Sequence, residues 1–415
     1  MAKPSRSKPK RKRRKKNKRW RSQRQQARCR ARAQAKHRKR RRNRRRKPTR
    51  GSWQGGTKSS FKHLLVFLAA LSTPLIPSQV ETLAAFIVAA LSANSCHLPQ
   101  IAAFMPLRIR QRSRLRRLER FLDSQKVDPM AVMAPIARWL LKQVKESGLY
   151  LVLDFTTKKD QFLIAMVSLV WGKRTIPLAW AIGLANTKGV SRRALAQQAV
   201  RQVAEWIPKG KSVIFIADRE FRGKGWRRLL KKELKWHFVI RLSADRTFAY
   251  LPDGSVRHLC NLKVQKGEAY YWTGVYLTLQ RDGPYQLAAV WDEKADEPWL
   301  LISDLADPKL LPGIYCQRWS IESTFRDFKS YGFDLEASRI EDVDRFNRLL
   351  LGLALAYGWA VRIGHWLDQS GQRLLVDRGS KPKQSAYRLG RYWLVYLWSL
   401  GSDQIEQVHF ASVPT

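Results

Sequence analysis

The 415-residue chain has few acidic residues, few cysteines and no long apolar run. It carries 32 aspartates and glutamates against 80 lysines and arginines, a formal net charge of +48. Its four cysteines are scattered and form no C-x-x-C pair, which argues against a disulfide framework or a cysteine-based zinc site. No apolar stretch reaches the roughly 18–20 residues that a membrane span needs, and no apolar signal segment is found at the N-terminus. We therefore expect a protein of the reducing cytoplasm.

The positive charge is spread unevenly. Residues 1–50 contain 28 basic residues and no acidic ones, which leaves 52 basic and 32 acidic residues in the remainder. Such an excess indicates a polyanionic partner, either nucleic acid or an anionic membrane surface, and the lack of an apolar face in the tail argues against the membrane. We predict that residues 1–60 form a disordered basic tail that adds sequence-independent DNA affinity; alternatively, part of it lies outside the functional protein.

The next segment has helical periodicity. Apolar residues recur at helical spacing through residues 61–125, and Ser78 with Glu81 predicts a capping box. A basic run covers residues 108–117, and a helical connector is expected over residues 128–147. Residues 61–147 are interpreted as a helical DNA-binding domain and connector, with a plain helical packing domain as the alternative.

From Gly148 onward the sequence pattern is that of an α/β domain. Three consecutive β-rich runs (LYLVLDFTT, QFLIAMVSLVW and RTIPLAWAIG) predict an antiparallel meander. A helix (191–206), a strand (212–218), a helix (225–234) and a strand (236–242) are expected to follow. This order is typical of a ribonuclease-H-like fold. Further segments are a β-rich insertion over residues 243–298, a strand over 298–305, and a C-terminal region over 369–415.

Two aspartates stand where predicted buried strands end. Asp154 closes LYLVLD and Asp218 closes VIFIAD. A carboxylate placed directly after an apolar strand is costly unless it is paired, hydrated or bound to a cation. One interpretation is that each aspartate caps a turn; the other is that both belong to a functional site.

A third acid lies in the segment YCQRWSIESTFRDFK. If this segment is one helix, Tyr315, Arg318, Glu322 and Lys329 share a face about 60° wide, at about 100° per residue. The plain interpretation is a solvated face with an Arg318–Glu322 ion pair. The segment also resembles the signature Y-x₂-R-x₃-E-x₆-K of DDE transposases from bacterial insertion sequences, in the cut-and-paste group named for these residues.

The resemblance extends over roughly residues 148–368 and implies a catalytic domain. Asp154, Asp218 and Glu322 match the family's three acids, which implies that they hold two Mg²⁺ or Mn²⁺ ions. Tyr315, Arg318 and Lys329 match residues that grip the transposon end. The implied reaction is cleavage at the ends of an insertion sequence, followed by joining of the 3′ ends to target DNA.

The resemblance also implies binding partners, an oligomeric state and a cellular location. These are double-stranded DNA in the form of terminal inverted repeats and target, no membrane, a dimer when DNA is bound, and a prokaryotic, nucleoid-associated cytoplasmic location. Two other functions stay open. One is a metal-dependent nuclease of the same fold that cuts without strand transfer. The other is a non-enzymatic basic DNA-binding protein, which leaves the strand-terminal acids unexplained.

Overall fold

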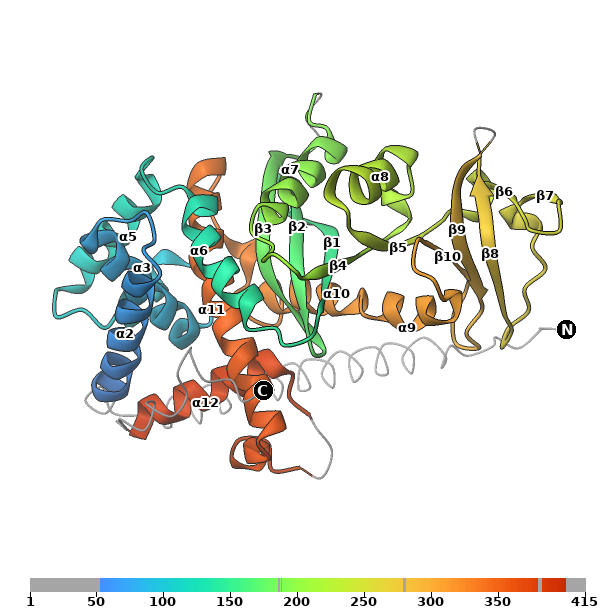
Figure 1. The fold of residues 1–415 in the computed structure, drawn as a ribbon. Helices are drawn as coiled ribbons and strands as arrows, with labels where there is room; N and C mark the ends of the chain where they lie inside the picture. Colours follow the sequence, from blue (N-terminus) through green and yellow to red (C-terminus); the bar gives the residue numbers. More distant parts are fainter. Residues whose placement is uncertain (1–52, 186, 188, 279–280, 380–382, 401–415) are drawn as a thin grey trace, which may run out of the picture. The chain divides into compact units, whose positions relative to one another are not determined.

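The computed structural model describes residues 53–185, 187, 189–278, 281–379 and 383–400. Its first part is helical, as expected for residues 61–125 and for the connector (Figure 1). Asp128 caps the connector helix by accepting a hydrogen bond from the backbone N–H of Met130 at 2.9 Å. The helices are α2 (Trp53–Ala70), α3 (Pro77–Ala93), α4 (Leu98–Phe104), α5 (Gln111–Asp123) and α6 (Pro129–Lys142).

Two details of the predicted N-terminal region are wrong. Helix α2 begins at Trp53, so residues 53–60 are helical rather than part of a tail. The reason is tertiary, because Ser60 is buried and accepts a hydrogen bond from the Trp398 indole at 2.8 Å. The rest of the predicted tail, residues 1–52, lies outside the described residues.

The predicted capping box of α3 is the second correction. The helix starts at Pro77, and the side chain of Gln79 accepts a hydrogen bond from the backbone N–H of Ile76 at 3.1 Å. Glu81 instead forms an ion pair with Arg117 of α5. A longer-range partner therefore replaces the local capping contact.

The central sheet has the predicted order of strands. Its first five are β1 (Gly148–Lys158), β2 (Phe162–Trp171), β3 (Arg174–Leu184), β4 (Ser212–Ala217) and β5 (His237–Arg241). Strands β1, β2 and β3 form the antiparallel meander, and β4 and β5 add parallel to β1, giving the spatial order β3-β2-β1-β4-β5. The strands are nearly continuous apolar runs because helices cover both faces of the sheet.

The helices between these strands lie on one face. Helix α7 (Arg192–Ala204) packs on β2 and β3, and Ser191 caps it by accepting a hydrogen bond from the Ala194 N–H at 3.2 Å. Helix α8 (Lys224–Arg228) continues directly into a π-helical turn, Leu229–Leu234. Figure 1 shows α7 and α8 on the same side of the sheet.

Among the described residues, the segment predicted as a β-rich insertion, residues 243–298, contains four strands that extend the central sheet. Its strands are β6 (Phe248–Tyr250), β7 (Val256–His258), β8 (Ala269–Leu277) and β9 (Asp282–Val290), followed by β10 (Trp299–Ser303). Strand β10 pairs antiparallel with β5 on one side and with β9 on the other. The described residues thus form one sheet of ten strands, in the order β3-β2-β1-β4-β5-β10-β9-β8-β6-β7.

The single helix expected over Tyr315–Lys329 is wrong. The segment forms α9 (Leu311–Cys316) and α10 (Trp319–Phe328), with Lys329 just past the end of α10. Between them the backbone bonds run from residue i to i−3, as in Arg318 N–H to Tyr315 O at 2.9 Å. This tighter 3₁₀ pattern interrupts the α-helical period that the sequence suggested.

The last two helices complete the fold. Helix α11 (Val343–Gln369) contains a long buried apolar run, and α12 (Ala386–Leu400) packs along it. Short 3₁₀ turns cover Arg219–Phe221, Ala244–Arg246, Leu259–Asn261, Pro308–Leu310, Leu335–Ala337 and Gln372–Leu375. Within the described ranges no single helix is long and apolar enough to cross a membrane, although α3 and α4, bent by 103°, pass that test as a pair.

Candidate active site

The two strand-terminal aspartates lie side by side. In the parallel pairing of β1 with β4, Leu153 is opposite Ala217, and this is the last pair of the register. Asp154 and Asp218 are the next residues on the two strands. Their carboxylates therefore emerge at the same end of adjacent parallel strands.

Asp154 is partly buried, and its side chain is less exposed than that of Glu322. Its side chain keeps 21% of its area exposed; one oxygen accepts from the Phe155 N–H at 2.8 Å and the other from the Arg318 guanidinium at 3.2 Å. Burial raises the pKa of this carboxyl to about 6, and the nearby charges of Asp218 and Glu322 add to the rise, while Arg318 opposes it. The three acids are thus close enough to interact electrostatically.

Asp218 has a second role as a turn cap. Its carboxylate accepts from the backbone N–H of Arg219 at 2.7 Å, which caps the 3₁₀ turn after β4. The same oxygen accepts from the Tyr315 hydroxyl at 3.3 Å. Tyr315 is fully buried, and burial raises its pKa to about 12, so the phenol stays protonated and donates to Asp218. The turn-cap and functional-site interpretations of Asp218 are therefore compatible.

Glu322 is joined to the aspartates through Arg318. The guanidinium of Arg318 donates to Glu322 at 2.6 Å and to Asp154 at 3.2 Å, so it links α10 to β1. The Arg318–Glu322 pair expected from the spacing does form, but it is no solvated face, because the Arg318 side chain is only 7% exposed. Five of the six predicted site residues form this cluster.

Lys329 is the predicted residue that makes a different contact. Its amino group pairs with Glu336 at 3.1 Å, and its side chain is partly exposed at 26%. Lys329 follows the end of α10, so it does not lie on the helix face that its spacing predicted.

The donor set suits a divalent cation. Asp154, Asp218 and Glu322 supply carboxylate oxygens, the ligand type that Mg²⁺ and Mn²⁺ prefer. The raised pKa of Asp154 shows that its negative charge is poorly compensated, and a cation would compensate it. In the present side-chain arrangement, no group of three acids, histidines or cysteines among the described residues stands close enough to hold a metal ion. The chemistry of the residues fits, and Arg318 contacts both Asp154 and Glu322.

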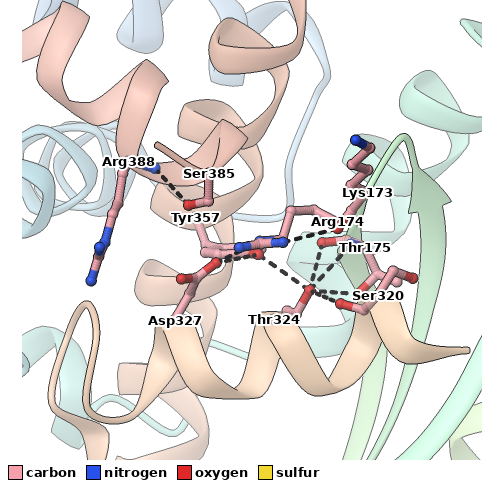
Figure 2. Close-up of polar contacts among 9 residues, drawn as sticks. All are labelled: Lys173, Arg174, Thr175, Ser320, Thr324, Asp327, Tyr357, Ser385 and Arg388. Atoms are coloured by element: carbon pink, nitrogen blue, oxygen red, sulfur yellow. Dashed lines mark hydrogen bonds and ion pairs between the residues drawn. The ribbon is translucent and has the colours of Figure 1, made fainter. Parts of the chain in front are cut away.

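A buried polar network fixes the other side of α10 (Figure 2). The Thr324 hydroxyl lies 2.9 Å from that of Thr175 on β3 and accepts from the Tyr357 hydroxyl of α11 at 3.2 Å. One turn further along, Asp327 forms an ion pair with Arg174 of β3 at 2.8 Å. Burial raises the pKa of Asp327, opposed by the Arg174 charge. The helix that carries Glu322 is thereby attached to both the sheet and α11.

Sequence reasoning did not find this network. Thr324 and Asp327 follow Glu322 by two and five residues, so they face away from the predicted site. Their partners Thr175 and Arg174 lie about 150 positions earlier in the chain. The only local signal is a threonine and an aspartate on the apolar side of an amphipathic helix.

The comparisons with known proteins agree with the cluster. A model of the transposase DDE domain family matches residues 157–359. The match includes Asp218, Tyr315, Arg318, Glu322 and Lys329, and it begins three residues after Asp154. No curated protein matches the sequence. Similarity to the transposase DDE domain suggests transposase activity, and thus an enzyme that acts on DNA.

Proposed function

We propose that this chain is a transposase that cuts DNA at the ends of an insertion sequence and joins the freed 3′ ends to target DNA. The observation that carries the proposal is the convergence of Asp154 and Asp218, on adjacent parallel strands, with Glu322 on α10. The family match over residues 157–359 supports the same conclusion. Asp154, Asp218 and Glu322 are the proposed catalytic residues.

The three carboxylates are also the proposed ligands of two Mg²⁺ or Mn²⁺ ions. Such ions, when bound, activate the attacking water or 3′-hydroxyl and stabilise the leaving oxygen of the phosphodiester. Ionised carboxylates bind cations, so the raised pKa of Asp154, about 6, predicts weaker metal binding below that pH. No high-energy cofactor is required, because transesterification conserves the phosphodiester.

Tyr315, Arg318 and Lys329 are the proposed contacts to the transposon end. Charged and phenolic donors suit phosphate oxygens. A scissile phosphate held at the carboxylates would lie next to the Arg318 guanidinium and the Tyr315 hydroxyl, which both touch those carboxylates. Lys329 is the more exposed of the three and would reach a phosphate further along the strand.

The helical region 61–147 is proposed to recognise the terminal repeats. On α5, Arg112, Arg116 and Arg120 follow each other at four-residue spacing and are all exposed. None of the three takes part in an ion pair within the described part of the chain. The opposite side of α5 is buried through Leu118 and Phe121, which is the arrangement of a helix that packs by one face and offers the other to DNA.

The proposed fold type and transposase group rest on the strand order and on the residues of the α9–α10 segment. The strand order β3-β2-β1-β4-β5, antiparallel and then parallel, supports a ribonuclease-H-like core. The residues Tyr315, Arg318, Glu322 and Lys329 support the Y-R-E-K cut-and-paste group, a bacterial insertion sequence and action at the nucleoid. Because a mobile element has two ends, we propose a dimer on DNA.

Strand transfer is the decisive test against a nuclease that only cuts. Duplexes carrying the DNA that flanks the gene for this chain, already ended in a 3′-hydroxyl, are mixed with plasmid and Mg²⁺. We expect covalent joining to the plasmid by the wild type and none by Asp218→Asn, although both bind the duplex. Cutting of intact flanking DNA with no joining of the precut duplex would contradict the proposal and identify a nuclease.

A further inference from the structure

A second basic surface lies on α8 and the π-helical turn that follows it. Residues 222–235 (RGKGWRRLLKKELK) contain seven lysines and arginines and a single acid, Glu233. That acid is paired with Arg201 of α7 at 2.8 Å. The segment therefore presents a large excess of positive charge, and its one acid is already paired.

The exposed cations follow one face of the helix. Lys224, Arg228, Lys232 and Lys235 succeed each other at steps of four, four and three residues, and all are exposed. Lys224, Arg228 and Lys232 follow each other at four-residue steps through α8 and the π-helical turn, which keeps their side chains on nearly the same face. Lys235 is the residue that ends the turn. No ion pair to any of the four is formed by the described residues. We call this row the basic ridge.

The base of the ridge is held firmly. Trp226, Leu229 and Leu230 are buried, and the Trp226 ring stacks near Phe215 of β4. Arg227, only 3% exposed, forms an ion pair with Asp282 of β9 at 2.6 Å. Buried contacts on one side and unpaired cations on the other make a rigid charged surface rather than a loose basic loop.

The ridge and the candidate active-site helices lie on opposite faces of the sheet. Neighbouring residues of a strand point to opposite faces. Asp154 contacts Arg318, between α9 and α10, whereas the next residue, Phe155, lies under Arg192 of α7 at 4.3 Å. On β4, Phe215 contacts Trp226 of α8, and Asp218, three residues on, contacts Tyr315 of α9. Figure 1 shows the same separation of α7 and α8 from α9 and α10.

We propose that the basic ridge binds the phosphate backbone of the target duplex while the α9–α10 side holds the transposon end. This inference rests on the proposed transposase function. Strand transfer needs two duplexes at one centre, and the opposite faces provide separate surfaces for them. Asp218 is six residues before Lys224, so the ridge begins close to the candidate centre. Duplex DNA carries one charge per about 1.7 Å, so a row of four cations meets several phosphates without reading bases.

The test compares two triple variants of equal charge. The ridge variant is Lys224→Gln, Arg228→Gln and Lys232→Gln. The control variant is Lys209→Gln, Lys294→Gln and Lys309→Gln, which removes three exposed cations elsewhere. Each is compared with wild type in binding to a duplex of unrelated sequence, in cleavage of flanking ends, and in joining of precut ends to plasmid.

The ridge variant should lose target binding selectively. Loss of three phosphate contacts lowers the slope of log affinity against log salt by about 2.7. Between 50 and 200 mM salt, wild-type affinity should then fall about 40-fold more than that of the ridge variant. Joining should fall at least about tenfold at the higher salt, while end cleavage stays within about twofold of wild type; the control variant should retain both.

Several results would overturn the inference. Equal salt slopes for the ridge and control variants would show that the ridge does not contact phosphate. Parallel losses of end cleavage and joining would assign the ridge to the transposon end instead of the target. If wild type neither cuts nor joins, the transposase proposal fails and with it the target role, while the salt slope still decides whether the ridge binds DNA.

Discussion

Replacing Asp154 by asparagine should stabilise the folded chain at neutral pH when divalent metal is removed. Burial, with the charges of Asp218 and Glu322, raises the pKa of Asp154 from 3.8 to about 6, despite the opposing Phe155 N–H and Arg318. One pKa unit corresponds to about 1.4 kcal/mol. Ionised Asp154 therefore lowers the free energy of unfolding by about 3 kcal/mol above pH 6.

The loss of the hydrogen bond to Arg318 reduces the stability gained by the Asp154→Asn substitution. Asparagine can still accept from the Phe155 N–H, now 2.8 Å from Asp154, but it loses the bond to Arg318, which we take as about 1 kcal/mol. Arg318 keeps Glu322 as its partner. We expect the variant to be more stable than wild type by about 2 kcal/mol at pH 7.5.

The stability difference between Asp154→Asn and wild type should depend on pH. Because the folded-state pKa of Asp154 is above its ordinary value, the penalty is complete above about pH 6 and disappears as the pH falls towards 3.8. The advantage of asparagine should shrink to less than about 1 kcal/mol at pH 5.

Urea unfolding followed by tryptophan fluorescence, in EDTA at both pH values, measures these differences. A variant less stable than wild type at pH 7.5 would refute the reasoning. Mg²⁺ should raise the unfolding midpoint of wild type and leave that of Asp154→Asn unchanged, because metal that binds only the folded state stabilises it.

Two further predictions concern the packing around the site, each measured by urea unfolding. Asp327→Ala leaves Arg174 without its buried partner and should lower the free energy of unfolding by about 3 kcal/mol; a loss under about 1 kcal/mol would contradict a structural role for the network. Gly352→Ala places a methyl group 2.2 Å from the Phe86 ring and should lower the free energy of unfolding by about 1–3 kcal/mol. The control Gly313→Ala places its methyl group in open space in α9 and should be neutral or stabilising. Equal effects of the two substitutions would argue against the close approach of α11 to α3.

Local patterns were sufficient for the strands and for the acids at their ends. Asp154 and Asp218 each follow an uninterrupted apolar run, and in the structure these runs are parallel neighbours. The spacing of Arg318 and Glu322 likewise predicts their ion pair, because side chains four residues apart meet on any helix.

Contacts between distant segments could not be predicted in this way. Arg318 reaches Asp154 across 164 positions, and the backbone around it tightens into the 3₁₀ pattern that separates α9 from α10. No periodicity within the segment signals that break, so the angle predicted for Lys329 was wrong. The start of α2 was missed for a similar reason, since its partner Trp398 is 338 positions away from Ser60.

Metal-dependent cleavage is the most direct test of the three-carboxylate centre. The substrate is intact DNA that carries the flanks of the gene for this chain, incubated in Mg²⁺ with wild type, with Glu322→Gln, or with Glu205→Gln as a control at an exposed acid of the α7 end. We predict nicking at the flanks by wild type and the control, none by Glu322→Gln, and equal DNA binding by all three. Equal nicking by wild type and Glu322→Gln would contradict the central claim and leave Glu322 as the ion-pair partner of Arg318 alone.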